Sequence, residues 1–149
     1  MLEDDLAQLR RVIARGAAAR DIDAALKPIG SVGDPRTIAP LLLMLTDDVE
    51  DEGLWSLVHA AEHFDDATYI RHFLAALSGV VAGSSRWASI LLMRILNSEA
   101  SRAELIRQVR IAPVDTRKAA ALLCGAINER DARFLAKTTS VLLAASNDR

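Results

Sequence analysis

The sequence predicts an all-α protein, an α-solenoid of about four stacked helical hairpins preceded by a capping helix. Its 149 residues are 51% hydrophobic and 26% charged, and they include only 7 Gly and 4 Pro, a composition that favours helices. Apolar residues recur every 32 residues in two separate series, so each repeat would contain two helices. Within a repeat they follow the i, i+3, i+4, i+7 spacing of an amphipathic helix. Such a hairpin cannot cover its own apolar face, so neighbouring hairpins would stack.

The expected helices can be placed in order along the chain. A leading helix over residues 2–15, with Leu2, Leu6, Leu9 and Ile13 on one face, would cap the stack. The first helices of the four hairpins are expected over residues 21–30, 53–64, 85–97 and 116–128. The second helices are expected over residues 35–46, 67–78, 99–110 and 131–145. Together they would form a single helical-repeat domain over residues 1–149.

Boundary residues support these positions. One apolar series would lie in the first helices (Leu26, Val58, Ile90, Leu122) and the other in the second helices (Leu41, Phe73, Leu105). Residues that can cap helix starts are Asp34, Asp66, Ser85, Ser98, Asp115 and Asp131. Breaks are expected at residues 31–33, 79–83 and 112–113, and Pro40 should kink the first turns of its helix. Residues 33–42 resemble the second helix of short HEAT-type repeats, so the expected solenoid is HEAT-like.

The sequence lacks the features of an exported or membrane protein. Its first residues are acidic, without the basic and apolar stretches of a signal peptide. No apolar run approaches the roughly 18 to 20 residues of a membrane span. The single Cys124 cannot form an internal disulfide, and its apolar neighbours place it in the core. We therefore predict a cytoplasmic protein with no membrane contact.

The sequence His59 to His63, HAAEH, matches the H-x-x-E-H pattern of inverted zinc peptidases. The 32-residue register argues for packing instead, because it aligns both histidines with apolar residues of other repeats. It also aligns Glu62 with Arg94, and a buried charge needs a partner, so we predict an ion pair between them. We predict no catalytic residue, no metal site and no cofactor.

Charge is distributed unevenly along the chain. Residues 1–66 carry 14 acids and 6 bases, whereas residues 67–149 carry 6 acids and 12 bases. A basic helical solenoid can hold a phosphate backbone, but Phe134 is the one aromatic residue among the clustered bases, so stacking platforms are missing. The clustered bases are Arg102, Arg107, Arg110, Arg117, Lys118, Arg130, Arg133 and Lys137.

The acidic link, residues 47–52, holds five carboxylates in six residues between the first and second hairpins. One interpretation is a solvated turn whose last acids favour the start of the next helix. However, the equivalent links, residues 79–84 and 111–116, are nearly uncharged, so the repeat does not require this charge. With Trp55 one turn further on and Tyr69 beyond, the region also has the composition of an interface. Trp55 is equally compatible with a place in the core.

Two phrases of the sequence carry a resemblance to a known family. They are HAAEHFD at residues 59–65, and RWA at residues 86–88 followed by MRILNS at residues 93–98. Residues 30–110 resemble the helical immunity proteins of bacterial polymorphic toxin systems, including contact-dependent growth inhibition. The resemblance implies a cytosolic protein that binds and blocks the C-terminal toxin domain delivered by a neighbouring cell. Many such toxins are nucleases with basic clefts, which an acidic surface can occupy.

We therefore predict a non-enzymatic immunity protein that neutralises a basic nuclease toxin. The acidic link would steer the toxin, and Trp55 or Tyr69 would anchor it. Two alternatives remain open: a nucleic-acid-binding HEAT-like repeat protein that uses the clustered bases, and an adaptor subunit of a larger assembly. The predicted partner-binding residues are Asp47, Asp48, Glu50, Asp51, Glu52, Trp55, Asp65, Asp66 and Tyr69.

Overall fold

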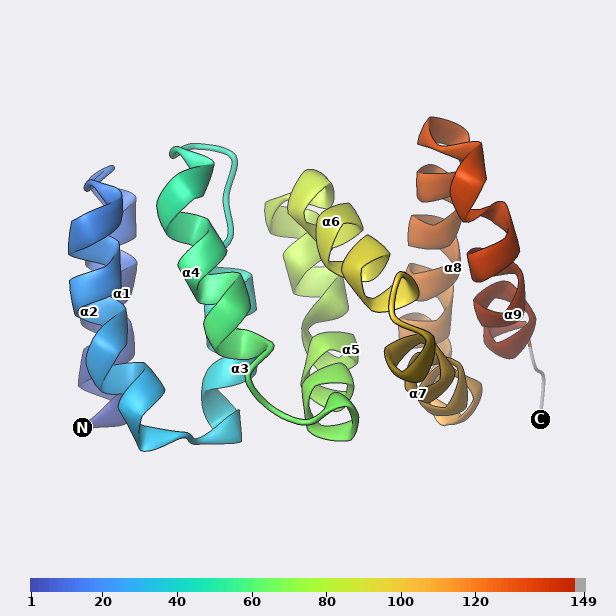
Figure 1. The fold of residues 1–149 in the computed structure, drawn as a ribbon, viewed down its shortest axis with the longest axis horizontal. Helices are drawn as coiled ribbons and strands as arrows, with labels where there is room; N and C mark the ends of the chain where they lie inside the picture. Colours follow the sequence, from blue (N-terminus) through green and yellow to red (C-terminus); the bar gives the residue numbers. More distant parts are fainter. Residues whose placement is uncertain (147–149) are drawn as a thin grey trace.

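The computed structural model describes residues 1–146, and this part of the chain is all-α, as predicted (Figure 1). Two short 3-10 turns, η1 (Pro35–Thr37) and η2 (Ala132–Phe134), lead into α3 and α9. No helix in the described residues is both long and apolar enough to cross a membrane. The helices are α1 (Leu2–Ala14), α2 (Ala19–Val32), α3 (Ile38–Leu43), α4 (Asp51–Ala61), α5 (Asp66–Gly83), α6 (Ser85–Leu96), α7 (Glu99–Ile111), α8 (Val114–Arg130) and α9 (Leu135–Ala145).

Each helix expected from the sequence is present, and the local chemistry explains the ends of the first hairpin. Gly33 ends α2 in the left-handed conformation, with φ of 67°, which costs glycine no side-chain clash. Asp34 then caps η1, because its carboxylate accepts a hydrogen bond from the Arg36 N–H at 2.9 Å. Pro40 lies in the first turn of α3, where its missing N–H leaves no helical bond unmade. The distortion expected at Pro40 is therefore a 3-10 start followed by a short α-helix.

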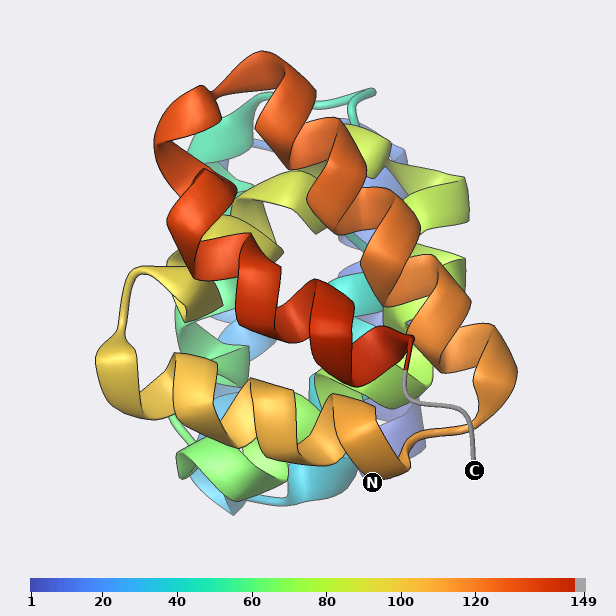
Figure 2. The same ribbon diagram turned by 90° about the vertical axis from the view of Figure 1, so that its right-hand side faces the viewer.

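The helices form a row of paired elements (Figures 1 and 2). α1 packs on α2, α2 on α4, α3 on α5, α5 on α7, and α7 on α9. α2, α4 and α6 lie on the near side of Figure 1, with α1, α3 and α5 behind them, and Figure 2 shows α7 running across the molecule. One hydrophobic cluster extends from Leu6 on α1 to Ala144 on α9. The row fits the expected stack of hairpins.

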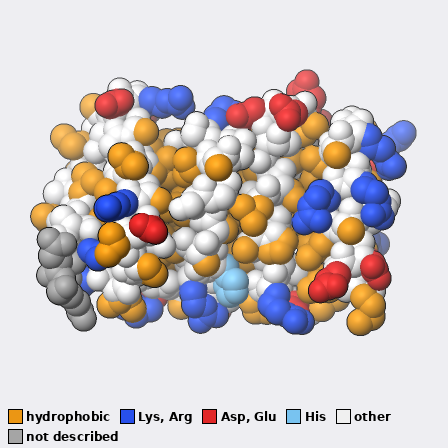
Figure 3. Space-filling view, turned by 180° about the vertical axis from the view of Figure 1, so that it is seen from behind, with side chains coloured by type: hydrophobic (Ala, Val, Ile, Leu, Met, Phe, Trp, Pro, Cys, Tyr) orange, Lys and Arg blue, Asp and Glu red, His pale blue; other side chains and the backbone are white. Residues whose placement is uncertain are grey.

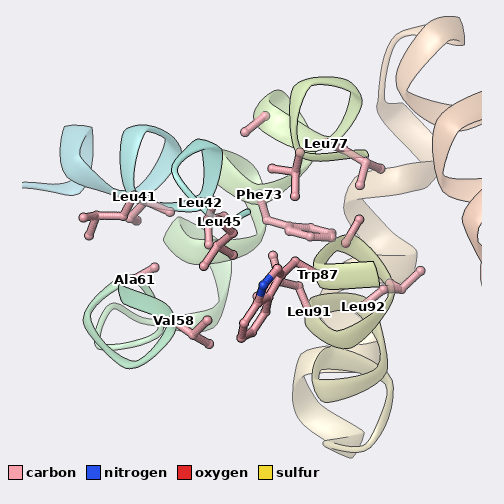
Figure 4. Packing of buried hydrophobic residues seen from close by; sticks show 14 of the residues in the cluster. Leu41, Leu42, Leu45, Val58, Ala61, Phe73, Leu77, Trp87, Leu91 and Leu92 are labelled. Carbon is pink, nitrogen blue, oxygen red and sulfur yellow. The ribbon is translucent and has the colours of Figure 1, made fainter. Parts of the chain in front are cut away.

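The boundary between α4 and α6, termed the seam, is built differently from its neighbours. α2 approaches α4 so closely that a Cβ on Gly53 would lie 2.6 Å from Ile22 Cδ1. In contrast, α4 and α6 are not among the closely packed pairs of described helices. Trp87 fills the space between them, fully buried between Val58 and Leu91 (Figure 4). Side chains, not backbones in contact, therefore hold the seam together.

One predicted break and one position of the 32-residue register are wrong. α5 continues through residues 79–83 to Gly83, so the expected break there is absent and Ser84 alone links α5 to α6. Leu122 is 77% exposed and not in the core. The buried residues of α6 lie 34 positions after those of α4, and not 32 positions after them. For example, Leu57 on α4 corresponds to Leu91 on α6. α6 begins at Ser85, as expected, but its buried face lies two residues later than the register predicts, so the first apolar series loses its register between α4 and α6.

Two expected caps are displaced by one residue, and a third is absent. Asp65, not Asp66, caps α5, and Ser84, not Ser85, caps α6. α8 begins after Pro113 without a side-chain cap, so Asp115 has no capping role. The predicted caps at Asp34, Ser98 and Asp131 are confirmed.

Candidate functional site

The acidic link connects α3 to α4 at one end of the seam. It faces the turn between α1 and α2 across an open groove of about 750 Å³, whose lining includes Ala17, Ile22 and all five carboxylates of the link. Asp51 and Glu52 lie in the first turn of α4, where negative charge is favoured by the helix dipole. The turn interpretation therefore accounts for these two acids, but not for the other three.

Arg86, at the start of α6, clamps two of the five acids. Its guanidinium donates two hydrogen bonds to Asp51, at 2.8 and 3.0 Å, and one to Asp47 at 3.0 Å. Asp47 also accepts a hydrogen bond from the Ser84 hydroxyl at 2.9 Å. These bonds lower the pKa of Asp51 and raise that of Arg86, because each charge stabilises the other. Asp47 and Asp51 therefore hold the link against α6.

The other three carboxylates of the link are open to solvent. Asp48, Glu50 and Glu52 are exposed, and none forms an ion pair within the described residues. The Asp48 N–H donates to the Thr46 hydroxyl at 3.2 Å, so the backbone, not the carboxylate, is held. The structure thus separates a structural pair, Asp47 and Asp51, from a set of three unpaired charges.

Trp55 lies half-buried in the middle of the seam. Its ring meets the Trp87 ring edge-on, with centroids 5.1 Å apart, and the Arg94 guanidinium lies 5.4 Å from its centroid. Trp87 is fixed from the other side, since its Nε1 donates to the Thr46 carbonyl at 3.2 Å. The edge-on contact with Trp87 and the position of Arg94 over the Trp55 ring are favourable geometries for aromatic and cation–π interactions, respectively. Trp55 is therefore partly core, as the alternative interpretation holds, with one part of its side chain left at the surface.

The predicted ion pair between Glu62 and Arg94 is confirmed. Arg94 donates two hydrogen bonds to the carboxylate, at 2.7 and 2.8 Å. The pair is not buried, however, because the side chain of Arg94 is 40% exposed and that of Glu62 is 24% exposed. The hydrogen bonds to Glu62 raise the pKa of Arg94. This pair closes the seam at the end opposite the acidic link.

The other predicted binding residues gather around the turn between α4 and α5. Asp65 is a cap, whose carboxylate accepts bonds from the N–H and the hydroxyl of Thr68 that lower its pKa. Asp66 is exposed and accepts a hydrogen bond from the Ser101 hydroxyl at 2.8 Å. Tyr69 is only 5% exposed, and burial, followed by the nearby Glu62, raises its pKa. Its hydroxyl is the one buried side-chain polar atom in the described residues without a hydrogen-bond partner.

A second groove, of about 420 Å³, opens at this end of the seam and is termed the Tyr69 groove. One wall comes from the turn between α4 and α5, and the other from the end of α6 and the start of α7. Its lining includes Glu62, Phe64, Asp66, Tyr69, Arg94 and Ser101.

Sequence analysis missed two residues that organise these sites, Arg86 and Ser101. Arg86 follows Asp51 by 35 residues and Ser101 follows Asp66 by 35, close to the repeat length. The spacing that predicted the Glu62–Arg94 pair, two opposite charges one repeat apart, also indicates Arg86 as a partner of Asp51 when three residues of drift are allowed.

The prediction that His59 and His63 occupy packing positions is wrong, because both are exposed. The 32-residue register aligned His59 with the buried Leu91, whereas the observed offset of 34 aligns it with the partly exposed Met93. The described residues contain no group of three or more His, Cys, Asp or Glu side chains placed to hold a metal ion. His63 instead packs its ring edge-on against Phe64, with centroids 6.2 Å apart.

Five of the eight clustered bases donate hydrogen bonds within the described residues. Arg102, Arg107 and Arg133 donate to the Leu96 carbonyl, Glu104 and Asp131, respectively. Arg117 donates to backbone carbonyls, and Lys137 to Asn97. The opposite face from Figure 1 likewise mixes basic, acidic and apolar side chains (Figure 3).

The part of the chain that matches a known family includes both ends of the seam. The immunity protein 30 family model matches residues 9–105, about two thirds of the chain, from α1 into α7. Every predicted binding residue lies inside this match, and the predicted immunity-protein class is confirmed. No curated protein and no solved structure matches the chain. The chain belongs to the immunity protein 30 family.

Proposed function

We propose that this chain neutralises the C-terminal domain of a basic nuclease toxin delivered by contact-dependent growth inhibition, by binding it in the cytoplasm without catalysing a reaction. Membership in an immunity protein family supports a toxin as the partner. The proposed surface is the exposed side of the seam, from the acidic link to the turn between α4 and α5. The toxin would be held by protein–protein contacts alone.

The observation that carries the proposal is the set of three unpaired carboxylates on the acidic link. Asp48 and Glu50 lie in a link that the fold does not need to be acidic, since the link between α5 and α6 is Ser84 alone, and Glu52 adds a third exposed carboxylate from the first turn of α4. Arg86 neutralises part of the link and fixes its backbone, so the remaining charges are presented from a fixed position. A fixed patch of one sign steers an oppositely charged partner and raises the association rate.

The placement of the bases argues against the nucleic-acid alternative. Of the eight clustered bases, Arg110, Lys118 and Arg130 form no side-chain hydrogen bond or ion pair within the described residues. Lys118 and Arg130 stand 12 residues apart on α8, which separates them by about 18 Å along the helix. Three separated cations do not follow a phosphate backbone, whose binding grows with the number of phosphates neutralised together.

The direct test first identifies the cognate toxin domain, for which a toxin gene ending immediately upstream of this chain's gene is the candidate, and then measures association with that domain. We expect the triple reversal Asp48→Lys, Glu50→Lys and Glu52→Lys to slow association at least tenfold in low salt. The difference should shrink as salt rises, because the Debye length falls from about 30 Å at 0.01 M to about 3 Å at 1 M. Asp47 and Asp51 are left intact, so the clamp by Arg86 is preserved.

The matched control reverses three exposed acids elsewhere, Asp4→Lys, Asp115→Lys and Glu129→Lys, for the same change in net charge. It should slow association much less than the triple reversal. Equal slowing by both variants would assign the effect to net charge and remove the acidic link from the interface. If the wild-type chain does not bind this toxin domain, the proposed function itself is wrong.

A titration followed by fluorescence anisotropy addresses the nucleic-acid alternative. We expect no salt-dependent affinity for labelled DNA or RNA at low ionic strength, since the acidic face repels phosphates. Saturable binding, with a logarithm of the binding constant that falls linearly with the logarithm of salt concentration, would favour a nucleic-acid-binding protein over a toxin inhibitor.

A further inference from the structure

Four residues form a stripe along the outer side of α8, termed the α8 stripe. Lys118, Leu122, Gly125 and Glu129 follow one another at intervals of four, three and four residues, so they lie in line along one face of the helix. Gly125 is partly exposed and the other three are exposed. Leu122 is 77% exposed, more than any other leucine of the described residues. A single exposed leucine is ordinary on a protein surface, but this one lies between two charges and beside a glycine.

The groups of the α8 stripe have no partner within the chain. Lys118 and Glu129 form no side-chain hydrogen bond or ion pair within residues 1–146. The two lie 11 residues apart, about 16 Å along the helix, which is too far for them to pair with each other. A Cβ added to Gly125 would meet nothing within 4 Å, so the space over this glycine is open. The stripe therefore presents one apolar side chain, one open position and one charge of each sign.

The order of the four positions makes the stripe complementary to itself. Consider two α8 helices packed antiparallel about a point midway between Leu122 and Gly125. Leu122 of each copy then packs over Gly125 of the other, where the missing side chain lets the helices approach closely. Lys118 of each copy lies opposite Glu129 of the other, because both charges lie four residues outward from the central pair. A two-fold axis makes every one of these contacts twice.

A second copy suits this face better than the toxin does. The immunity protein 30 match ends at residue 105, before α8 begins, so the part shared by the family does not include the stripe. The proposed toxin surface lies along α4, and Figure 1 places α5 and α6 between α4 and α8. Figure 2 shows α8 beside α9 at the end of the row. The proposed toxin is basic, so Lys118 and the exposed Arg130 would repel it.

We propose that this chain forms a two-fold symmetric homodimer through α8, in which Leu122 packs over Gly125 of the second copy and Lys118 pairs with its Glu129. The 17 residues of α8 span about 25 Å. One helix face of that length is smaller than a standard interface of about 800 Å² per partner, so the dimer is weak. We expect a dissociation constant between about 1 µM and 1 mM. No toxin residue takes part, so the inference does not depend on the proposed function.

The test measures the mass of the full chain by sedimentation equilibrium at concentrations up to about 1 mM. The mass of the wild type should rise from 16.1 kDa toward twice that value. Lys118→Glu and Glu129→Lys should each weaken association about five- to thirtyfold, because two attractions per dimer become two repulsions. The double variant that carries both changes should restore association, since the pair forms again with its signs exchanged. A double variant as weak as the single ones would overturn the antiparallel alignment.

Two further variants test the apolar contact. Gly125→Leu fills the open position with a better helix former, so the variant should fold and remain monomeric. Leu122→Ser should weaken association at least about tenfold, whereas the matched control Val32→Ser, at a 60% exposed position on α2, should leave it unchanged. Equal effects of Leu122→Ser and Val32→Ser would remove the stripe from the interface. A wild type that stays monomeric at about 1 mM would overturn the dimer, and if Gly125→Leu then lost toxin affinity, the toxin would be the occupant.

Discussion

The two ends of α4 differ in which polar groups the fold leaves without a partner. At its start, five carboxylates crowd a short link, one arginine from α6 clamps two of them, and three remain as open charge. At its end, Glu62 is paired with Arg94 and Asp66 is bonded to Ser101, yet the neutral Tyr69 hydroxyl is left unsatisfied. Open charge acts over a Debye length and governs how fast a partner arrives, whereas a buried hydroxyl without a partner lowers the stability of the chain itself. The two ends therefore predict different defects, in association rate at the first and in stability at the second.

Removing the Trp87 side chain, which fills the seam, should have the largest effect on stability. Trp87 is fully buried, touches Trp55 and donates to Thr46 beside the acidic link. We expect Trp87→Ala to lower the free energy of unfolding by about 3 to 5 kcal/mol, measured by urea denaturation, because it leaves a cavity in the seam. Trp55→Ala, at the half-buried position, is the control and should cost less. Equal losses in the free energy of unfolding would show that the two rings contribute alike and that Trp87 has no special role in the seam.

Tyr69→Phe should move the stability of the free protein in the opposite direction. Since the hydroxyl makes no hydrogen bond, removing it relieves a desolvation penalty, and we expect a gain of up to about 1 kcal/mol in the free energy of unfolding. Thermal melting in the absence of toxin measures it. A loss of 1 kcal/mol would instead reveal an internal partner for the hydroxyl.

Arg86→Met should release the acidic link with a modest loss of stability. The guanidinium and Asp51 are both about 40% exposed, so we expect a loss of only about 0.5 to 1 kcal/mol after solvent screening. Association with a basic toxin domain should become faster in low salt, because the link gains one net negative charge. Stopped-flow mixing measures the rate, and a slower rate would mean that the shape of the link outweighs its charge.

The same variant tests the pH dependence of stability. Arg86 lowers the folded pKa of Asp51, so the pair stabilises the protein above the unfolded pKa of about 3.9 and this contribution is lost as pH falls through the folded value. The difference in stability between wild type and Arg86→Met should therefore be full at pH 7 and shrink below about pH 4. A difference that persists at pH 2 would assign the effect to packing on Trp87.

The smallest effect is expected at the other ion pair. Glu62→Gln keeps the shape of the side chain and removes its charge, so we expect a loss of about 0.5 kcal/mol by urea denaturation. An effect larger than that of Arg86→Met would show that the seam depends more on its Tyr69 end than on its acidic end.

Periodicity was enough to predict the helices, because each amphipathic face must be buried against a neighbour whatever the details. It also predicted the Glu62–Arg94 pair, since long side chains reach across a small error in register. It failed at α5, which continues past residue 78 to Gly83, and at α6, whose buried face lies two residues later than the register predicts, so Leu122 and His59 were misplaced. Helix length inside a repeat is set by tertiary contacts, and a sequence period does not record them.

The candidate site was predicted unevenly for a related reason. A run of acids is visible in sequence, so the link was found, but the clamp by Arg86 depends on which side chains meet across the seam. Tyr69 was predicted as a binding anchor because aromatic residues surrounded by charges are typical of interfaces, whereas the structure buries the ring and leaves its hydroxyl without a hydrogen-bond partner.

Because α4 is one uninterrupted helix, its length fixes the distance between the two ends of the seam. Its 11 residues set a separation of about 16 Å that no side-chain substitution changes. A toxin that engages both ends must present its basic groups at that spacing, so cognate pairing would be encoded as a length as well as a charge. Lengthening α4 by one turn should then weaken binding of the cognate toxin even though every recognition residue is kept.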